Sequence, residues 1–345
     1  MADLEPLLSI VVTSRNDDHG GNALRRMQLF VSSLLQQLTR HNLDSELIIV
    51  EWNPPLDRPR LVDVLKWPSK PGSCAVRIIE VPAEIHRRFD HSEKLPLFQM
   101  IAKNVGIRRA QGRFVLATNI DILFSDEMMR FLASDQLVDR CFYRVDRYDV
   151  PSDIPDDVSI DEQLKYCWQN VLRINRRNDT RVLGNGGFNL RRLVKDARSS
   201  LREIRRIIRG EEQPLHTNAC GDFTLMAREH WFAVRGYAEF ELYSFWIDSL
   251  LCYAAHYAGA KEAVLKDPMR IYHIEHSLGS GWTPGPGGEL LNRRLEVAGI
   301  PQLSGNQYAV WVKQMRKQRQ PIIFNESQAW GLANESLPET IIASR

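Results

Sequence analysis

The stretch FVLATNIDILFSDE, residues 114–127, joins an apolar run to side chains that carry oxygen atoms. Residues 114–118 are apolar enough to form a buried strand, and Asn119, Asp121 and Asp126 follow them. Carboxylate and amide oxygens accept hydrogen bonds and bind hard cations. A strand that delivers such groups at its carboxyl end raises the question of what they hold.

The residues before this run predict alternating strands and helices. Apolar, β-branched runs predict strands, and apolar residues at helical spacing predict helices. The expected strands are residues 7–13, 45–51, 77–81 and 114–118, and the expected helices are residues 24–38 and 97–110. Such alternation favours a parallel sheet covered by helices on both faces.

Polar side chains follow three of these strands. Ligands of parallel sheets bind in the crevice beyond the carboxyl ends of the strands, where loops and helix amino termini converge. The polar groups are Ser14, Arg15, Asn16 and Asp17 after the first strand, Glu51, Trp52 and Asn53 after the second, and Asn119, Ile120 and Asp121 after the fourth. We expect all three groups to face one crevice.

Composition limits the classes of protein that this chain can represent. Its 345 residues, 43% of them hydrophobic and 26% charged, suffice for one large core or two smaller ones. A net charge of +2 gives no reason to expect a nucleic-acid partner. Five scattered cysteines without a CxxC pair predict neither a disulfide framework nor a structural zinc site, and favour a reducing cytoplasm.

No apolar segment is long enough to suggest a membrane span, and the amino-terminal run lacks the basic start of a secretion signal. We therefore expect a cytoplasmic protein, and peripheral contact with a membrane stays open. Residues 191–209 read as a basic amphipathic helix. Its partner would be an anionic membrane surface, a lipid diphosphate or an acidic glycan; a solvated helix face is the alternative.

Several segments resemble family 2 glycosyltransferases and GT-A-fold enzymes generally. AKNVGIRRAQGRFVLATNID is similar to their helix and Asp-x-Asp strand, and SIVVTSRND resembles their opening strand. VEWNPP is closer to exostosin-like glycosyltransferases, and residues 221–259 resemble the acceptor half. The residues in register with the helix-and-strand motif are Lys103, Asn104, Gly106, Gly112 and Asp121.

This resemblance implies an α/β fold of GT-A type, with a mostly parallel twisted central sheet flanked by helices and an irregular acceptor-side half. Residues 1–125 would form the nucleotide-sugar-binding half and residues 126–320 the acceptor-binding and catalytic half. Residues 321–345 would form a peripheral tail. The implied reaction moves a sugar from a nucleoside diphosphate, most simply UDP, to a hydroxyl of a glycan or glycolipid.

The resemblance also implies a divalent metal, Mn²⁺ or Mg²⁺, that neutralises the diphosphate leaving group. Asp121 would be its main ligand, and His273 or His276 would complete the coordination, although polar packing explains an HxxH pair equally simply. Asn119 replaces the first Asp of Asp-x-Asp, which removes one negative charge and would weaken or abolish metal dependence. Trp282, in the Gly- and Pro-rich residues 277–288, would close over the donor.

Asp248 occupies the place of the general base of inverting family members, and Asp222 is a rival. The match to the family is partial, because Ile247 replaces the usual preceding Glu. A helix amino-terminal cap, which Asp commonly supplies, is the alternative role for Asp248. If the chain follows the exostosin-like enzymes instead, the reaction would retain the configuration of the anomeric carbon.

The expected donor contacts also have structural alternatives. Asn16 and Asp17 would bind the base or ribose, or serve as turn residues. Trp52 would stack on a pyrimidine beside Asn53, or pack in the core. Lys103 would offset phosphate charge, or extend from its helix to solvent.

Two other functions fit parts of the sequence. A sugar-nucleotide nucleotidyltransferase shares such a sheet, but His19-Gly20-Gly21 is a poor version of its Gly-rich loop. The chain could also be a non-catalytic nucleotide- or glycan-binding module. Asn119 and Ile247 would then mark the loss of acidic residues that catalysis needs.

Overall fold

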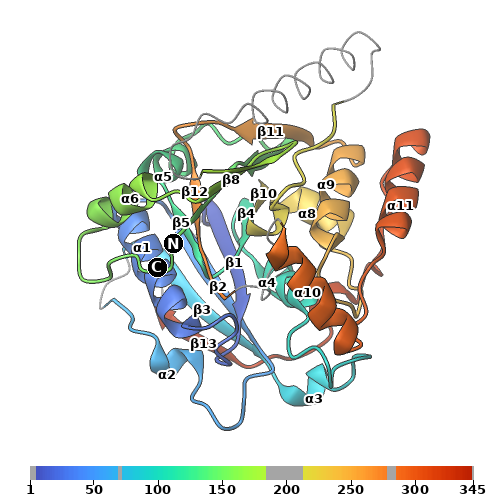
Figure 1. The fold of residues 1–345 in the computed structure, drawn as a ribbon, viewed down its shortest axis with the longest axis horizontal. Helices are drawn as coiled ribbons and strands as arrows, with labels where there is room; N and C mark the ends of the chain where they lie inside the picture. Colours follow the sequence, from blue (N-terminus) through green and yellow to red (C-terminus); the bar gives the residue numbers. More distant parts are fainter. Residues whose placement is uncertain (1–4, 69–71, 184–212, 278–284, 344–345) are drawn as a thin grey trace.

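The computed structural model describes residues 5–68, 72–183, 213–277 and 285–343, which form two sheets with helices packed around them (Figure 1). The larger sheet has eight strands in the order β11-β6-β10-β4-β1-β2-β3-β13 within these residues. Its strands are β1 (Leu8–Ser14), β2 (Ser45–Trp52), β3 (Cys74–Val81), β4 (Phe114–Thr118), β6 (Cys141–Val145), β10 (Phe223–Ala227), β11 (Lys261–Leu265) and β13 (Glu339–Ala343). Strands β1, β2, β3 and β4 run parallel to one another. Strands β10 and β13 are antiparallel to the strands beside them.

A smaller sheet lies next to this one, and it has the order β5-β12-β7-β8-β9 in the described part of the chain. Its strands are β5 (Ile122–Phe124), β7 (Arg147–Val150), β8 (Arg173–Asn175), β9 (Thr180–Val182) and β12 (Ile271–Ile274). Strand β5 follows β4 after three residues and pairs with β12. The smaller sheet therefore brings residues near position 273 to the end of β4.

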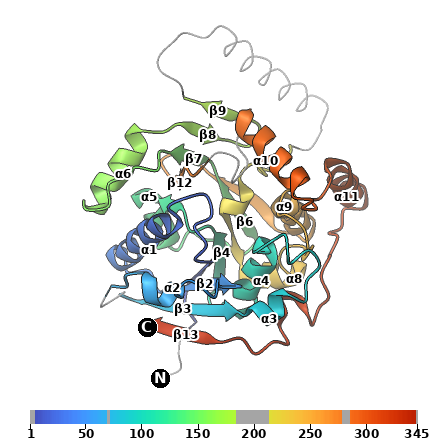
Figure 2. The same ribbon diagram turned by 60° about the horizontal axis from the view of Figure 1, so that its bottom comes forward.

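Helices cover both faces of the large sheet. Helices α1 (Ala23–Arg40) and α5 (Asp126–Leu132) lie on one face, and α4 (Gln99–Arg109), α8 (Arg228–Val234) and α9 (Ile247–Tyr257) lie on the other (Figure 2). The other helices are α2 (Leu61–Val64), α3 (Ala83–His86), α6 (Ile160–Gln169), α10 (Pro286–Val297) and α11 (Gly305–Gln318), with short 3₁₀ turns η1 (Cys220–Asp222) and η2 (Trp330–Leu332).

The sequence of β1 explains its central place. Every residue of β1 is buried, and alternate side chains enter opposite cores, with Val11 on the α4 side and Ile10 and Val12 on the α1 side. Gly106 of α4 packs directly on β1, because a Cβ at that position would lie 2.5 Å from Cγ1 of Val11. The glycine of the motif therefore lets this helix approach the sheet.

The expected α/β class, with parallel central strands flanked by helices, is confirmed, and each strand and helix expected before residue 120 is present. The division at residues 125 and 320 stays a prediction, since strands from both proposed halves share the large sheet. After residue 321 the chain returns to that sheet, where β13 forms its edge. The predicted basic helix at 191–209 and Trp282 lie outside the described residues.

Within the described residues, no helix combines the length and the apolar character that crossing a membrane would require. All five cysteines are free thiols, as their spacing predicts.

Candidate active site

A cavity of about 910 Å³ opens at the carboxyl ends of β1 and β4. The parallel register places Leu8 beside Phe114, so residues 119–121 emerge next to the end of β1. Of the residues expected from the sequence, ten line this cavity: Ser14, Arg15, Asp17, Asn119, Ile120, Asp121, Asp222, Asp248, His273 and His276. The structure thus brings together the first and fourth strand ends and both candidate bases.

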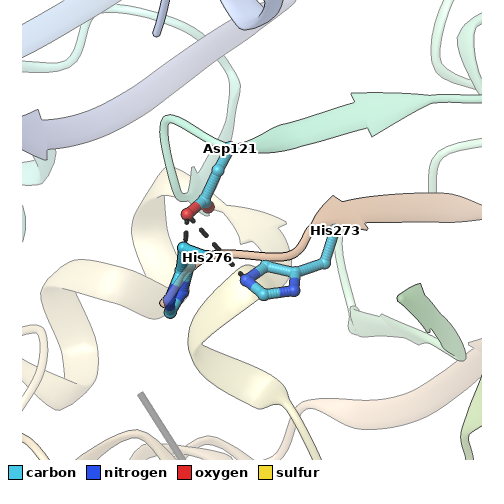
Figure 3. Close-up of side chains that lie close together, drawn as sticks. All are labelled: Asp121, His273 and His276. Atoms are coloured by element: carbon cyan, nitrogen blue, oxygen red, sulfur yellow. Dashed lines mark ion pairs between the residues drawn. The ribbon is translucent and has the colours of Figure 1, made fainter. Parts of the chain in front are cut away.

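Asp121, His273 and His276 converge on one point of the cavity wall (Figure 3). The Oδ2 atom of Asp121 lies 3.8 Å from Nε2 of His273 and 3.9 Å from Nε2 of His276. Antiparallel pairing sets this arrangement, because His273 lies opposite Ile122 and the backbone N–H of Ile274 donates to the carbonyl of Asp121. One carboxylate and two imidazoles could hold a metal ion here.

The chemistry of this cluster fits a divalent cation. Asp121 is only 7% exposed, and its Oδ1 atom is buried without a hydrogen-bond partner among the described residues. Buried carboxylate oxygens are rarely left unsatisfied, and a carboxylate that has one such oxygen, and whose other oxygen faces two imidazoles, suits a cation ligand. We therefore treat Asp121, His273 and His276 as the candidate metal ligands.

The two imidazoles differ in their electrostatic surroundings. Burial lowers the pKa of His273, but the nearby carboxylates of Asp121 and Asp149 outweigh burial and raise that pKa above its ordinary value. For His276, burial dominates and lowers the pKa to about 4, so this ring is neutral at pH 7. A neutral imidazole is the form that binds metal.

Behind His273 lies Asp149, a fully buried carboxylate that the sequence analysis did not select. Its Oδ1 atom lies 3.2 Å from Nδ1 of His273 and 2.8 Å from Nε of Arg147. Although burial opposes ionisation, Arg147 and His273 hold the pKa of Asp149 well below its ordinary value. The alternation Arg147-Tyr148-Asp149 in a strand places both charged side chains on one face, which was the available signal.

The carboxylate of Asp222 is hydrogen-bonded to two side chains. Its carboxylate accepts hydrogen bonds from Nη1 of Arg147 and Nδ2 of Asn119, each at 2.5 Å. Burial raises the pKa of Asp222, but Arg147, His273 and Lys103 together outweigh burial, and the net pKa is lowered. These contacts make Asp222 a weak candidate for accepting a proton, and they hold the amide of Asn119 against the Asp222 carboxylate.

Asp248 lies in the first turn of α9 and lines the cavity. No ion pair reaches its carboxylate within the described residues, and burial raises its pKa. Gly221 lies against it, since a Cβ there would be 3.0 Å from Oδ2 of Asp248. The alternative role as an amino-terminal cap is not observed, because Trp246 is the cap residue and the Asp248 side chain bonds to the adjacent N–H of Ser249.

The end of β2 does not line the cavity, contrary to expectation. Trp52 is fully buried, donates from Nε1 to Nδ1 of His86 and packs against Phe98, so it cannot stack on a nucleotide base. Glu51 is buried and accepts from the backbone N–H of Leu61. The protein itself already satisfies these polar groups.

Three other expected donor contacts also lie outside the cavity lining. Asn16 and Asn53 donate to the backbone carbonyls of Pro59 and Pro96. Lys103 is fully buried and donates from Nζ to the carbonyl of Gly221, and burial lowers its pKa to about 8. Lys103 therefore supports the turn that carries Asp222 and reaches neither solvent nor the cavity.

Arg26 is the principal lining residue that sequence reasoning missed. It lies in the first turn of α1, is only 3% exposed, and donates from Nη1 to Oδ2 of Asp121 at 2.8 Å. Its only sequence signal is its position just after the polar loop that follows β1.

The fold is similar to those of several solved glycosyltransferases. S. aureus TarS residues 1–349 in complex with UDP-GlcNAc has a TM-score of 0.45 and 14% identity, over 87% of this chain and 69% of that chain. GalNAc-T7 with UDP, GalNAc and Mn²⁺ has a TM-score of 0.43 and 12% identity, over 96% and 54%. The catalytic domain of Drosophila β1,4-galactosyltransferase 7, in complex with xylobiose, has a TM-score of 0.33 and 10% identity, over 75% and 64%.

This chain thus spans between about half and two thirds of these matched chains. It matches no protein-family model, and no curated protein matches its sequence. At identities of 10–14% and TM-scores below 0.5, the likeness concerns architecture, so a function has to rest on the geometry of the site.

Proposed function

We propose that this protein is a glycosyltransferase that moves a sugar from a nucleoside diphosphate, UDP in the simplest case, to a hydroxyl of a glycan or glycolipid. One observation carries the proposal. The Asp121, His273 and His276 cluster and the carboxylate of Asp248 share one cavity at the carboxyl ends of the central strands. This is where parallel α/β sheets bind phosphorylated ligands.

In this proposal Asp121, His273 and His276 hold the divalent cation, which when bound neutralises charge on the departing diphosphate. Two imidazole ligands favour Mn²⁺ over Mg²⁺, which prefers oxygen ligands. The cavity volume of about 910 Å³ lies within the range of small-molecule sites, so a nucleotide sugar and part of an acceptor have a place to bind.

Asp248 is the proposed general base. The acceptor oxygen bonds to the anomeric carbon, the bond from that carbon to the diphosphate oxygen breaks, and its electron pair leaves with the diphosphate. The hydroxyl proton passes to Asp248, whose raised pKa makes it a stronger base than an ordinary carboxylate. Asp222 stays paired with Arg147 and positions Asn119. Direct displacement of this kind inverts the anomeric configuration.

A thermal-shift titration with UDP and UDP-sugars, with and without Mn²⁺, tests binding, because a ligand of the native state raises the melting temperature. Release of UDP from labelled UDP-sugars, with and without candidate acceptors, then tests turnover. We expect stabilisation by UDP that increases with Mn²⁺, and UDP release. Stabilisation without release from any donor would favour a binding module, and the absence of both would contradict the proposed function.

A further inference from the structure

We propose that Arg26 forms a permanent ion pair with Asp121, and that its positive charge makes cation binding depend on the nucleotide diphosphate. The inference rests on the proposed function and assigns a role to a residue that lies beside the candidate metal ligands. It starts from a conflict in the geometry. The Asp121 oxygen that faces both imidazoles, Oδ2, is also the oxygen that accepts from Arg26.

Arg26 is firmly held in this position. Besides Nη1 on Asp121, its Nη2 donates to the carbonyl of His19 and its Nε donates to the carbonyl of Gly21 at 3.4 Å. The guanidinium therefore joins the carboxylate to the loop between β1 and α1. With 3% of its surface exposed, it is part of the site's wall and has little freedom to move away.

The same loop contacts the other side of the cluster. Gly20 has a φ of +75°, and a Cβ there would lie 3.0 Å from Nη2 of Arg26 and 3.2 Å from Cβ of His276. The carbonyl of Gly20 accepts from the backbone N–H of Ser277 at 2.8 Å. Arg26 and His276 are thus packed against one turn, and the guanidinium has a fixed place next to the candidate cation.

The charges of Arg26 and Asp121 affect how a cation can bind here. Asn119 contributes no charge, Asp121 is the single carboxylate of the Asp121, His273 and His276 cluster, and Arg26 already forms an ion pair with it. A divalent cation that arrives alone would share its one anionic ligand with a guanidinium, and like charges at such range in a buried site repel. A diphosphate adds negative charge that both cations can share. Nucleotide and cation should therefore strengthen one another's binding, reciprocally.

Isothermal titration of Mn²⁺ alone, UDP alone and Mn²⁺ in the presence of UDP tests this coupling. In Arg26→Gln, which removes the charge and keeps an N–H donor, we expect Mn²⁺ alone to bind about tenfold more tightly and UDP alone about tenfold more weakly, a size typical of coupled sites. Arg26→Lys keeps the charge and should leave the Mn²⁺ affinity near that of the wild type. Unchanged or weaker Mn²⁺ binding by Arg26→Gln would overturn the proposal.

Arg25→Gln is the matched control. Arg25 is the neighbouring residue of α1, pairs with Asp156 and does not line the cavity, so this variant should bind both ligands as the wild type does. If Arg26→Gln does not fold, the wild type alone still decides. It must bind Mn²⁺ at least about fivefold more tightly with UDP than without it, and equal affinities would refute the role of Arg26. A wild type that binds no UDP would instead refute the proposed function.

Discussion

The ends of strands β2 and β4 differ in how far the protein itself satisfies their polar groups. At the end of β2, Glu51 and Trp52 are buried, hydrogen-bonded within the protein and outside the cavity. At the end of β4, Asp121 lines the cavity, and one of its buried oxygens has no hydrogen-bond partner in the part of the chain that the structure describes. A place at the carboxyl end of a central strand is therefore not sufficient for a site. The group must also retain unused bonding capacity.

Replacement of Asp121 should give the largest effect. In Asp121→Ala, the cluster loses its single carboxylate and leaves Arg26 without its partner, so we expect transfer to be abolished and binding of UDP with Mn²⁺ to weaken. UDP release and calorimetric titration measure the two effects. Asp126→Ala is a suitable control, because Asp126, the first residue of α5, pairs with His41 and does not line the cavity. Wild-type turnover in Asp121→Ala would contradict the claim that the end of β4, unlike the end of β2, forms the active site.

Asp248→Asn should follow in size. Loss of the proton acceptor should lower the rate of transfer by roughly 10²-fold or more while UDP binding is retained. The pH profile provides a further check. Since the base must be ionised, activity falls as the pH drops through the pKa of Asp248, and a raised pKa places that fall above the range of an ordinary carboxylate. Unchanged turnover would rule Asp248 out as the base.

His273→Asn should act on metal dependence. Loss of one imidazole ligand should raise the Mn²⁺ concentration needed for half-maximal activity by about tenfold or more, in the range seen for changes around metal sites. His91→Asn, outside the cavity lining, serves as the control. Identical Mn²⁺ titrations for wild type and His273→Asn would support polar packing as the role of His273.

Trp52→Phe tests the other strand end. Removal of the indole leaves Nδ1 of His86 without its donor and opens space beside Phe98, so the free energy of unfolding should fall by about 1–3 kcal/mol. Denaturant titration measures this loss. UDP affinity should not change. If Trp52→Phe had wild-type stability but bound UDP more weakly, Trp52 would have to contact the donor.

Glu51→Gln should change only the way in which stability depends on pH. Burial raises the pKa of Glu51 to about 7, whereas the same group titrates near 4.5 when solvated. Its contribution to stability is therefore complete below about pH 4.5 and is lost as the pH rises through about 7. Gln stays neutral and can still accept from Leu61. The variant should match the wild type near pH 4.5 and exceed it by about 1–3 kcal/mol at pH 8. Parallel stability curves would contradict this.

Local sequence patterns predicted the central elements well. Residues 114–118 form the expected strand because a continuous apolar run suits a strand buried on both faces, and Asp121 follows it into the cavity. The same reasoning was wrong for Trp52. A terminal aromatic residue can face a ligand or the core, and the choice depends on distant residues such as His86 and Phe98.

Arg26 and Asp149 could not be assigned to the site for a related reason. Arg26 comes from a helix that packs on the sheet, and Asp149 reaches His273 only because β7 and β12 pair in the smaller sheet. These contacts depend on tertiary pairing between segments far apart in sequence. The alternation Arg147-Tyr148-Asp149 indicates that two charged side chains share one face of a strand, but it does not indicate which distant segment they meet.

Diffraction from crystals grown with UDP and Mn²⁺, with data collected at the manganese absorption edge, tests the central claim most directly. The account predicts an anomalous peak at about 2–2.5 Å from the Asp121 carboxylate and both imidazoles, adjacent to the diphosphate. UDP bound in the cavity without such a peak, or manganese bound elsewhere, would contradict it.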